Sequence, residues 1–199
     1  MKRAALFLLL VFLLSVGFMS QAQGGVLDLF SGLTGRTSND AQISSDDYSP
    51  DVANTLGPLK GKLLRLNNFV NRAENTKQFS YPSAEGKFFY VVGHGSVESY
   101  FWYCFQKALS SAGLIVLEET STAKAPSLSL TLFYLTDKQL KGEVTAANGN
   151  NPLKKIIEVS FEPPQTDKRE ESALSAYAFM DKIILAVFAD PEIIKALDF

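Results

Sequence analysis

The sequence predicts an α+β fold, with a mainly antiparallel sheet of four to five strands and two long helices packed on one face. Two segments, 97–112 and about 168–189, repeat apolar residues at helical spacing. The other patterned segments alternate apolar and polar residues or concentrate β-branched and aromatic residues, which is typical of strands. Because the order is strand, strand, helix, three or four strands and helix, we expect both helices to cover the same sheet.

The chain begins with the pattern of a secretory signal peptide. Two basic residues precede an unbroken apolar run over 4–14, and small residues precede Gln23. The run is too short to span a bilayer comfortably, so cleavage is favoured over anchoring. We therefore predict a signal peptide at 1–22 and an exported protein, periplasmic or extracellular, that has no membrane span after cleavage.

The next segment is predicted to be a flexible spacer, at 23–55. It is rich in Gly, Ser, Thr, Asn and Asp, and its one apolar island lies at Val26–Phe30. So little apolar area cannot offset the entropy lost on ordering the segment. The island is a candidate contact with a partner. A single α+β domain is then expected at 56–199.

The composition excludes several functional classes. The chain has 19 Lys and Arg against 21 Asp and Glu, a net charge of −2, and loss of the leader's two basic residues makes it −4. A protein with a net negative charge and no cluster of Lys and Arg lacks the basic surface that binds nucleic acid. Cys104 is the only cysteine and His94 the only histidine, so we predict no internal disulfide, no metal site and no cofactor.

The first two strands are predicted at Lys62–Phe69 and Lys87–Val92. The first alternates only weakly, and a helix over 56–70, broken by glycines, is the alternative. The second is an aromatic, β-rich run that stops at Gly93-His94-Gly95.

The first helix is the clearest element. Ser96 is placed as its N-cap and Gly113 is placed to end it. One face is apolar over four turns, through Val97, Tyr100, Phe101, Cys104, Ala108, Leu109 and Ala112.

Four more strands are predicted in the second half of the chain, at 114–119, 127–135, 142–147 and 154–162. The last three alternate strongly, and the turn residues at 148–152 separate the final two, so they are expected to form an antiparallel meander.

Two helices close the chain. Pro163-Pro164 stops the last strand before the long helix at about 168–189. Asp190 and Pro191 then suit the cap and the first position of a short terminal helix.

This pattern resembles the exported YajG-type lipoproteins and the related periplasmic modules of the curli-assembly and TolB-N-terminal group. Three stretches carry the likeness: Leu63–Asn71, Val97–Val116 and Ala173–Leu197. The resemblance implies a non-enzymatic role in the cell envelope and offers no catalytic residues. YajG-type proteins carry a lipidated cysteine after the leader, whereas this chain has none before Cys104, so the anchor is not carried over.

An aromatic cluster on the first helix is the candidate partner surface. Trp102, Tyr103 and Phe105 are predicted to point away from the buried face formed by Tyr100 and Phe101. They either pack under the N-terminal segment or form an exposed patch of the kind that binds proteins.

The glycine-rich turn before this helix is the only stretch that resembles a catalytic site. Its spacing fits neither a nucleophile elbow nor a Cys–His dyad, so Ser96 is interpreted as a cap and no catalytic residue is predicted. Backbone N–H groups at Gly95, Ser96 and Val97 could instead bind an anion at the helix N-terminus. The adjacent acids at 118–119 and 170–171 are interpreted as structural, because strand neighbours point to opposite faces and helix starts favour acids.

These features predict an exported, periplasmic, non-enzymatic interaction domain that supports assembly or maintenance of a cell-envelope structure through a protein partner. A small carrier of an apolar ligand or lipid is the first alternative. A hydrolase that uses Ser96 and His94 is the second.

Overall fold

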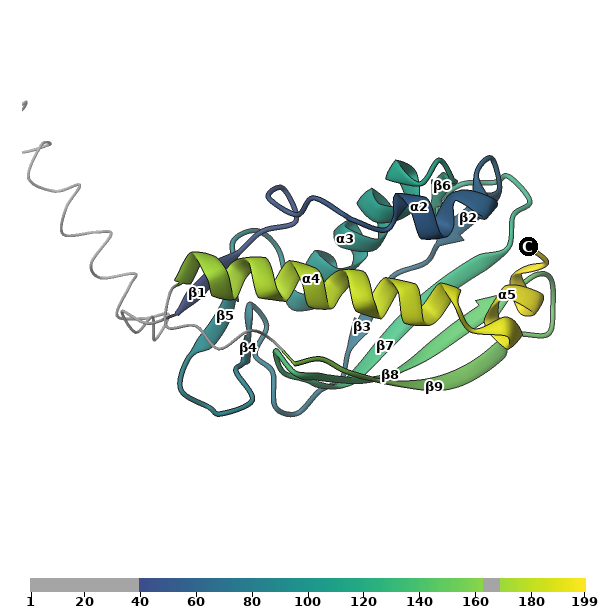
Figure 1. Cartoon of the computed structure of the whole chain (residues 1–199). Helices are drawn as coiled ribbons and strands as arrows, with labels where there is room; N and C mark the ends of the chain where they lie inside the picture. The colour runs from purple at the N-terminus through teal and green to yellow at the C-terminus, as the bar shows by residue number, and fades with distance from the viewer. Residues whose placement is uncertain (1–39, 163–168) are drawn as a thin grey trace, which may run out of the picture. The chain divides into compact units, whose positions relative to one another are not determined.

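Two sheets and four α-helices make up the part of the chain that the computed structural model describes, residues 40–162 and 169–199 (Figure 1). The elements in chain order are β1 (Ala41–Ile43), α2 (Ala53–Leu56), the 3-10 turn η1 (Gly57–Leu59), β2 (Leu63–Leu66), β3 (Val70–Asn71), β4 (Ser80–Pro82), β5 (Phe89–Val92), α3 (Val97–Ser111), β6 (Ile115–Glu118), β7 (Ser127–Leu135), β8 (Gln139–Ala147), β9 (Leu153–Ser160), α4 (Arg169–Phe188) and α5 (Pro191–Leu197).

Both sheets are mixed. The larger has six strands, in the order β6-β2-β7-β8-β9 with β3 also paired to β7, and the smaller has the order β1-β5-β4. The α+β class is confirmed, and β7, β8 and β9 form the predicted antiparallel meander. The prediction of one mainly antiparallel sheet of four to five strands is wrong, because β2 runs parallel to both β6 and β7. The chain passes through α3 between β2 and β6, and a helical crossover of this kind joins parallel strands.

One face of the six-stranded sheet is buried beneath helices. Leu128, Leu130 and Leu132 of β7 are fully buried, while the residues between them are partly exposed. Figure 1 shows α4 running along this face, with α3 beside it. The opposite face is polar and carries cross-strand ion pairs such as Lys141–Glu158, 2.7 Å between Nζ and Oε1. The core therefore lies between the helices and a single face of the sheet.

The caps of α3 are as predicted. The Ser96 hydroxyl accepts a hydrogen bond from the Ser99 backbone N–H at 3.4 Å. At the other end Gly113 has φ +87°, and the Leu114 N–H donates to the Leu109 carbonyl at 3.0 Å. This left-handed residue ends the helix and turns the chain into β6.

Residues 40–55 are part of the described fold, so the predicted spacer at 23–55 is too long at its C-terminal end. β1 pairs with β5, and Tyr48 is fully buried. Tyr48 donates a hydrogen bond to the Asp181 carboxylate of α4, and Lys107 of α3 donates to the Asp46 carbonyl at 2.8 Å. The composition of the predicted spacer is polar on average. This average concealed the few apolar residues that hold its C-terminal part in the fold. The predicted signal peptide and the rest of the spacer lie outside the described residues.

The Tyr48–Asp181 contact predicts a pH dependence of stability. Partial burial raises the pKa of the Asp181 carboxyl above its ordinary value, although the hydrogen bond from Tyr48 acts in the opposite direction. The folded state therefore binds this proton more tightly than the unfolded chain does. We expect the free energy of unfolding of the wild type to rise, relative to that of Asp181→Asn, as pH falls from 7 towards the ordinary carboxyl pKa of about 4. Urea titrations of both proteins across this range test it, and parallel pH profiles would contradict it.

Among the described residues, no single helix is both long enough and apolar enough to cross a membrane. Residues Glu171–Phe188 and α5 have the length and composition of a membrane span only as a pair, and the two helices are bent by 68°.

Candidate functional site

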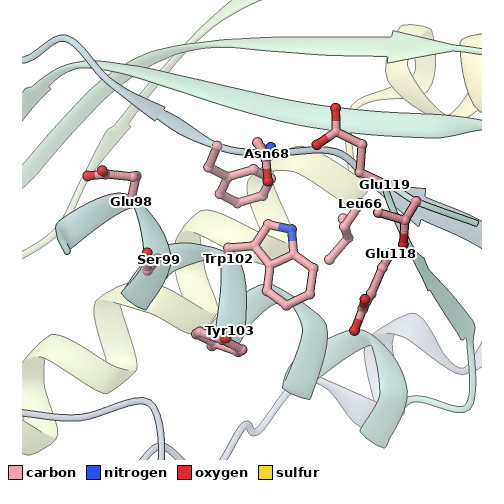
Figure 2. Close-up of a pocket in the computed structure, with 10 residues that line it drawn as sticks. Leu66, Asn68, Glu98, Ser99, Trp102, Tyr103, Glu118 and Glu119 are labelled. Atoms are coloured by element: carbon pink, nitrogen blue, oxygen red, sulfur yellow. The ribbon is translucent and has the colours of Figure 1, made fainter. Parts of the chain in front are cut away.

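A cleft of about 650 Å³ lies between the N-terminal half of α3 and the ends of β2 and β6. Residues from both sides line it: Leu66, Asn68, Phe69, Glu98, Ser99, Trp102, Tyr103, Glu118, Glu119 and Thr120. Figure 2 shows the Trp102 indole near the middle, with Glu98 to one side and Glu118 and Glu119 to the other. The volume is within the range of sites that hold small molecules or short chain segments.

The sheet side of the cleft is shaped by an irregularity between β2 and β3. Leu66 pairs with Leu128 of β7, and Val70 of β3 pairs with Thr131 of β7. The chain therefore advances by four residues from β2 to β3 while β7 advances by three, which leaves one extra residue opposite β7. An extra residue of this kind bends a strand and redirects its side chains. β6 also stops here, since Glu118 is its last residue and pairs with Leu66. The sheet edge steps back at this point and leaves room beside α3.

The helix side of the cleft carries two of the predicted partner residues. The Trp102 and Tyr103 rings pack edge to face, with centroids 5.1 Å apart. Tyr103 is 53% exposed and Trp102 is partly buried. The structure therefore brings Trp102 and Tyr103 together on α3, where both line the cleft.

Phe105 does not belong to this surface, contrary to the prediction. It is 0% exposed and packs edge to face on Phe69, with ring centroids 5.2 Å apart. Phe69 lies in the irregular segment between β2 and β3 and is itself almost fully buried. Because this segment delivers an aromatic ring to α3, the buried arc of the helix is wider than the apolar stripe alone predicted.

Three carboxylates at the cleft were not expected as a group. Glu98 comes from the first turn of α3, and Glu118 and Glu119 come from the end of β6. In a continuing strand these last two would point to opposite faces, but the strand ends between them and both line the cleft. None of the ten lining residues is Lys, Arg or His. The cleft is therefore acidic as well as aromatic.

The predicted anion site at Gly95, Ser96 and Val97 is largely occupied by the protein itself. The Val97 N–H donates to the Gln78 carbonyl at 2.9 Å, and the Ser96 hydroxyl lies 3.0 Å from that of Ser99. Gly95 has φ +72°, which the turn into α3 requires. The group acts as a helix cap and a turn.

The remaining chemical candidates are separated in the structure. His94 is exposed in the turn before α3, whereas Cys104 is fully buried. Burial raises the pKa of the Cys104 thiol well above its usual range, so the reactive thiolate is disfavoured. Among the residues that the structure describes, no three His, Cys, Asp or Glu side chains are placed to hold a metal ion.

No protein-family model matches the sequence, and no curated protein matches it either. Solved structures that match this chain include the following two. One is an uncharacterised protein with 13% identity, in which the match covers 75% of this chain and 99% of the other, at a TM-score of 0.49. The second is a Xanthomonas campestris protein described as a member of family DUF330, with 8% identity, coverage of 76% and 94%, and a TM-score of 0.49. Likenesses at this level carry no argument about function, and the resemblance to YajG-type proteins stays a prediction from sequence.

Proposed function

We propose that this protein is an exported, non-enzymatic interaction domain that binds a partner protein through the cleft beside α3 and so supports a cell-envelope structure. The observation that carries the binding role is the pair Trp102 and Tyr103. These two rings lie at the surface of a cleft, while the adjacent Phe105 is in the core.

Aromatic pairs of this kind are well suited to binding a protein. Trp and Tyr dominate the binding energy of interfaces, because each contributes a large rigid area at a low cost in side-chain entropy. Loss of one such anchor typically costs at least about 2 kcal/mol of binding free energy. Leu66 and Phe69 provide an apolar floor, and the glutamates provide a polar rim, which is the usual anatomy of an interface.

The export and envelope parts of the proposal are supported by sequence. The leader pattern at 1–22 supports export, and the resemblance to periplasmic envelope modules supports the envelope role. The carrier alternative is weaker, because carboxylates at the cleft would oppose an apolar tail. The hydrolase alternative is also weaker, because Ser96 is engaged as a helix cap.

Crosslinking in intact cells tests the proposal. A Trp102→Ala, Tyr103→Ala double variant is expected to lose its crosslinked adduct, because removal of the two rings should lower the affinity for the partner more than tenfold. Mass spectrometry of the wild-type adduct should locate the crosslinks beside α3.

The matched control is Tyr134→Ala, which removes an aromatic residue that is 41% exposed on the strand β7. This variant should keep the adduct. An adduct that survives the double variant at wild-type yield would contradict the proposed function.

A further inference from the structure

We propose that the cleft receives a segment of the partner protein that carries arginine or lysine. This inference deepens the proposed function and rests on it. The juxtaposition that supports it is an indole and a phenol ring with three carboxylates around them, and no basic side chain among the lining residues.

The carboxylates of the cleft form no ion pair with a basic residue in the part of the chain that the structure describes. Among residues 40–162 and 169–199, none of the ion pairs involves Glu98, Glu118 or Glu119. Elsewhere on the surface, glutamates lie beside lysines, as Glu158 does with Lys141. The acidic charge of the cleft is therefore available to a cation from outside, and a potential of one sign favours a partner of the opposite sign.

The aromatic rings favour an organic cation. The face of an indole attracts ammonium and guanidinium groups, and guanidinium also stacks on it. A guanidinium that stacks on Trp102 can also donate to a carboxylate at the rim, since its N–H groups lie in the plane of the group and point past the edge of the indole. Figure 2 places carboxylates on two sides of the indole. One cationic group can therefore contact the indole ring and a carboxylate at the same time.

The arrangement suits a chain segment better than a metal ion. The described residues contain no group of three acidic, His or Cys side chains that could hold a metal. A volume of about 650 Å³ also exceeds what one cationic side chain fills, and leaves room for the residues on either side of it. We therefore assign the cleft to a short basic segment.

Binding of a defined peptide to the purified protein tests this assignment. The probe is a capped hexapeptide, Gly-Arg-Gly-Gly-Arg-Gly, and its neutral match has glutamine in place of both arginines. Trp102 is the only tryptophan in the chain, so intrinsic tryptophan fluorescence reports from the cleft itself. We expect a saturable change with the arginine peptide, at least tenfold weaker binding of the glutamine peptide, and weaker binding at high salt.

Variants identify the carboxylates that are responsible. A Glu118→Gln, Glu119→Gln double variant should bind the arginine peptide at least fivefold more weakly. Glu158→Gln, which removes a carboxylate from β9, should bind it like the wild type. Equal binding of both peptides, no effect of the double variant, or equally tight binding of free choline would overturn the inference.

This test separates the two proposals. If the arginine peptide fails to bind but the Trp102→Ala, Tyr103→Ala variant still loses its cellular adduct, the cleft binds a partner of different chemistry. If the adduct also survives that variant, the proposed function fails as well.

Discussion

Replacing Phe105 with alanine is expected to lower the free energy of unfolding by about 3 to 5 kcal/mol, the cost of removing a large buried aromatic side chain. Phe105 is fully buried and its ring packs edge to face on Phe69. The substitution removes apolar area and leaves a cavity that the surrounding helix and sheet can fill only in part. Urea unfolding followed by circular dichroism measures the change.

Tyr103→Ala is the matched control, two residues away on the same helix. Because Tyr103 is more than half exposed, its removal should change the free energy of unfolding by no more than about 0.5 kcal/mol. If Tyr103→Ala lowered the free energy of unfolding much more than Phe105→Ala, Tyr103 and not Phe105 would be the core residue. That result would contradict the description of the cleft.

The second large effect is expected at Gly142, in the middle of β8. A Cβ atom added there would lie 2.8 Å from the backbone oxygen of Thr131 and 3.2 Å from Cδ1 of Leu130. The first neighbour belongs to the backbone of the paired strand β7, so it cannot move without disturbing the sheet. Gly142→Ala should therefore cost about 1 to 3 kcal/mol of stability, as overpacking does, measured by urea or thermal unfolding.

Gly93→Ala provides the comparison for this prediction. The nearest neighbour of a Cβ atom at Gly93 would be the backbone oxygen of Ile43 at 3.5 Å, which is an ordinary van der Waals distance. Stability should change by no more than about 1 kcal/mol. Equal costs at the two glycines would show that the close contact with β7 is not what excludes a side chain.

Local signals in the sequence predicted the elements well but not how the strands pair. Alternation gave the meander, and cap residues located the start and end of α3. Alternation carries no information about the direction of the neighbouring strand, so the parallel pairing of β2 with β6 and β7 was missed. The short strands β1 and β3 pair with β5 and β7, which are distant in sequence, so no local pattern records them. β4 pairs with the nearby β5, but its three residues are too few to show an alternation.

The cleft was partly predictable. Trp102 and Tyr103 stood out because the apolar stripe of the helix excluded them, and the structure places both at the cleft. The prediction for Phe105 is wrong because the irregular segment between β2 and β3 packs Phe69 on it and so widens the buried face of α3. Glu118 and Glu119 were interpreted as strand residues because the end of β6 was not known. The position of Glu98 beside Trp102 was predictable from the sequence, because Glu98 lies four residues before Trp102 and so on the same face of the helix.

The most direct test of the central claim is the indole N–H signal of Trp102 in a ¹⁵N-labelled sample titrated with the arginine hexapeptide. With a single tryptophan in the chain, the signal needs no assignment. The cleft described here predicts that it shifts and saturates with the peptide and not with the glutamine match. A signal that stays in place while resonances elsewhere move would contradict the account.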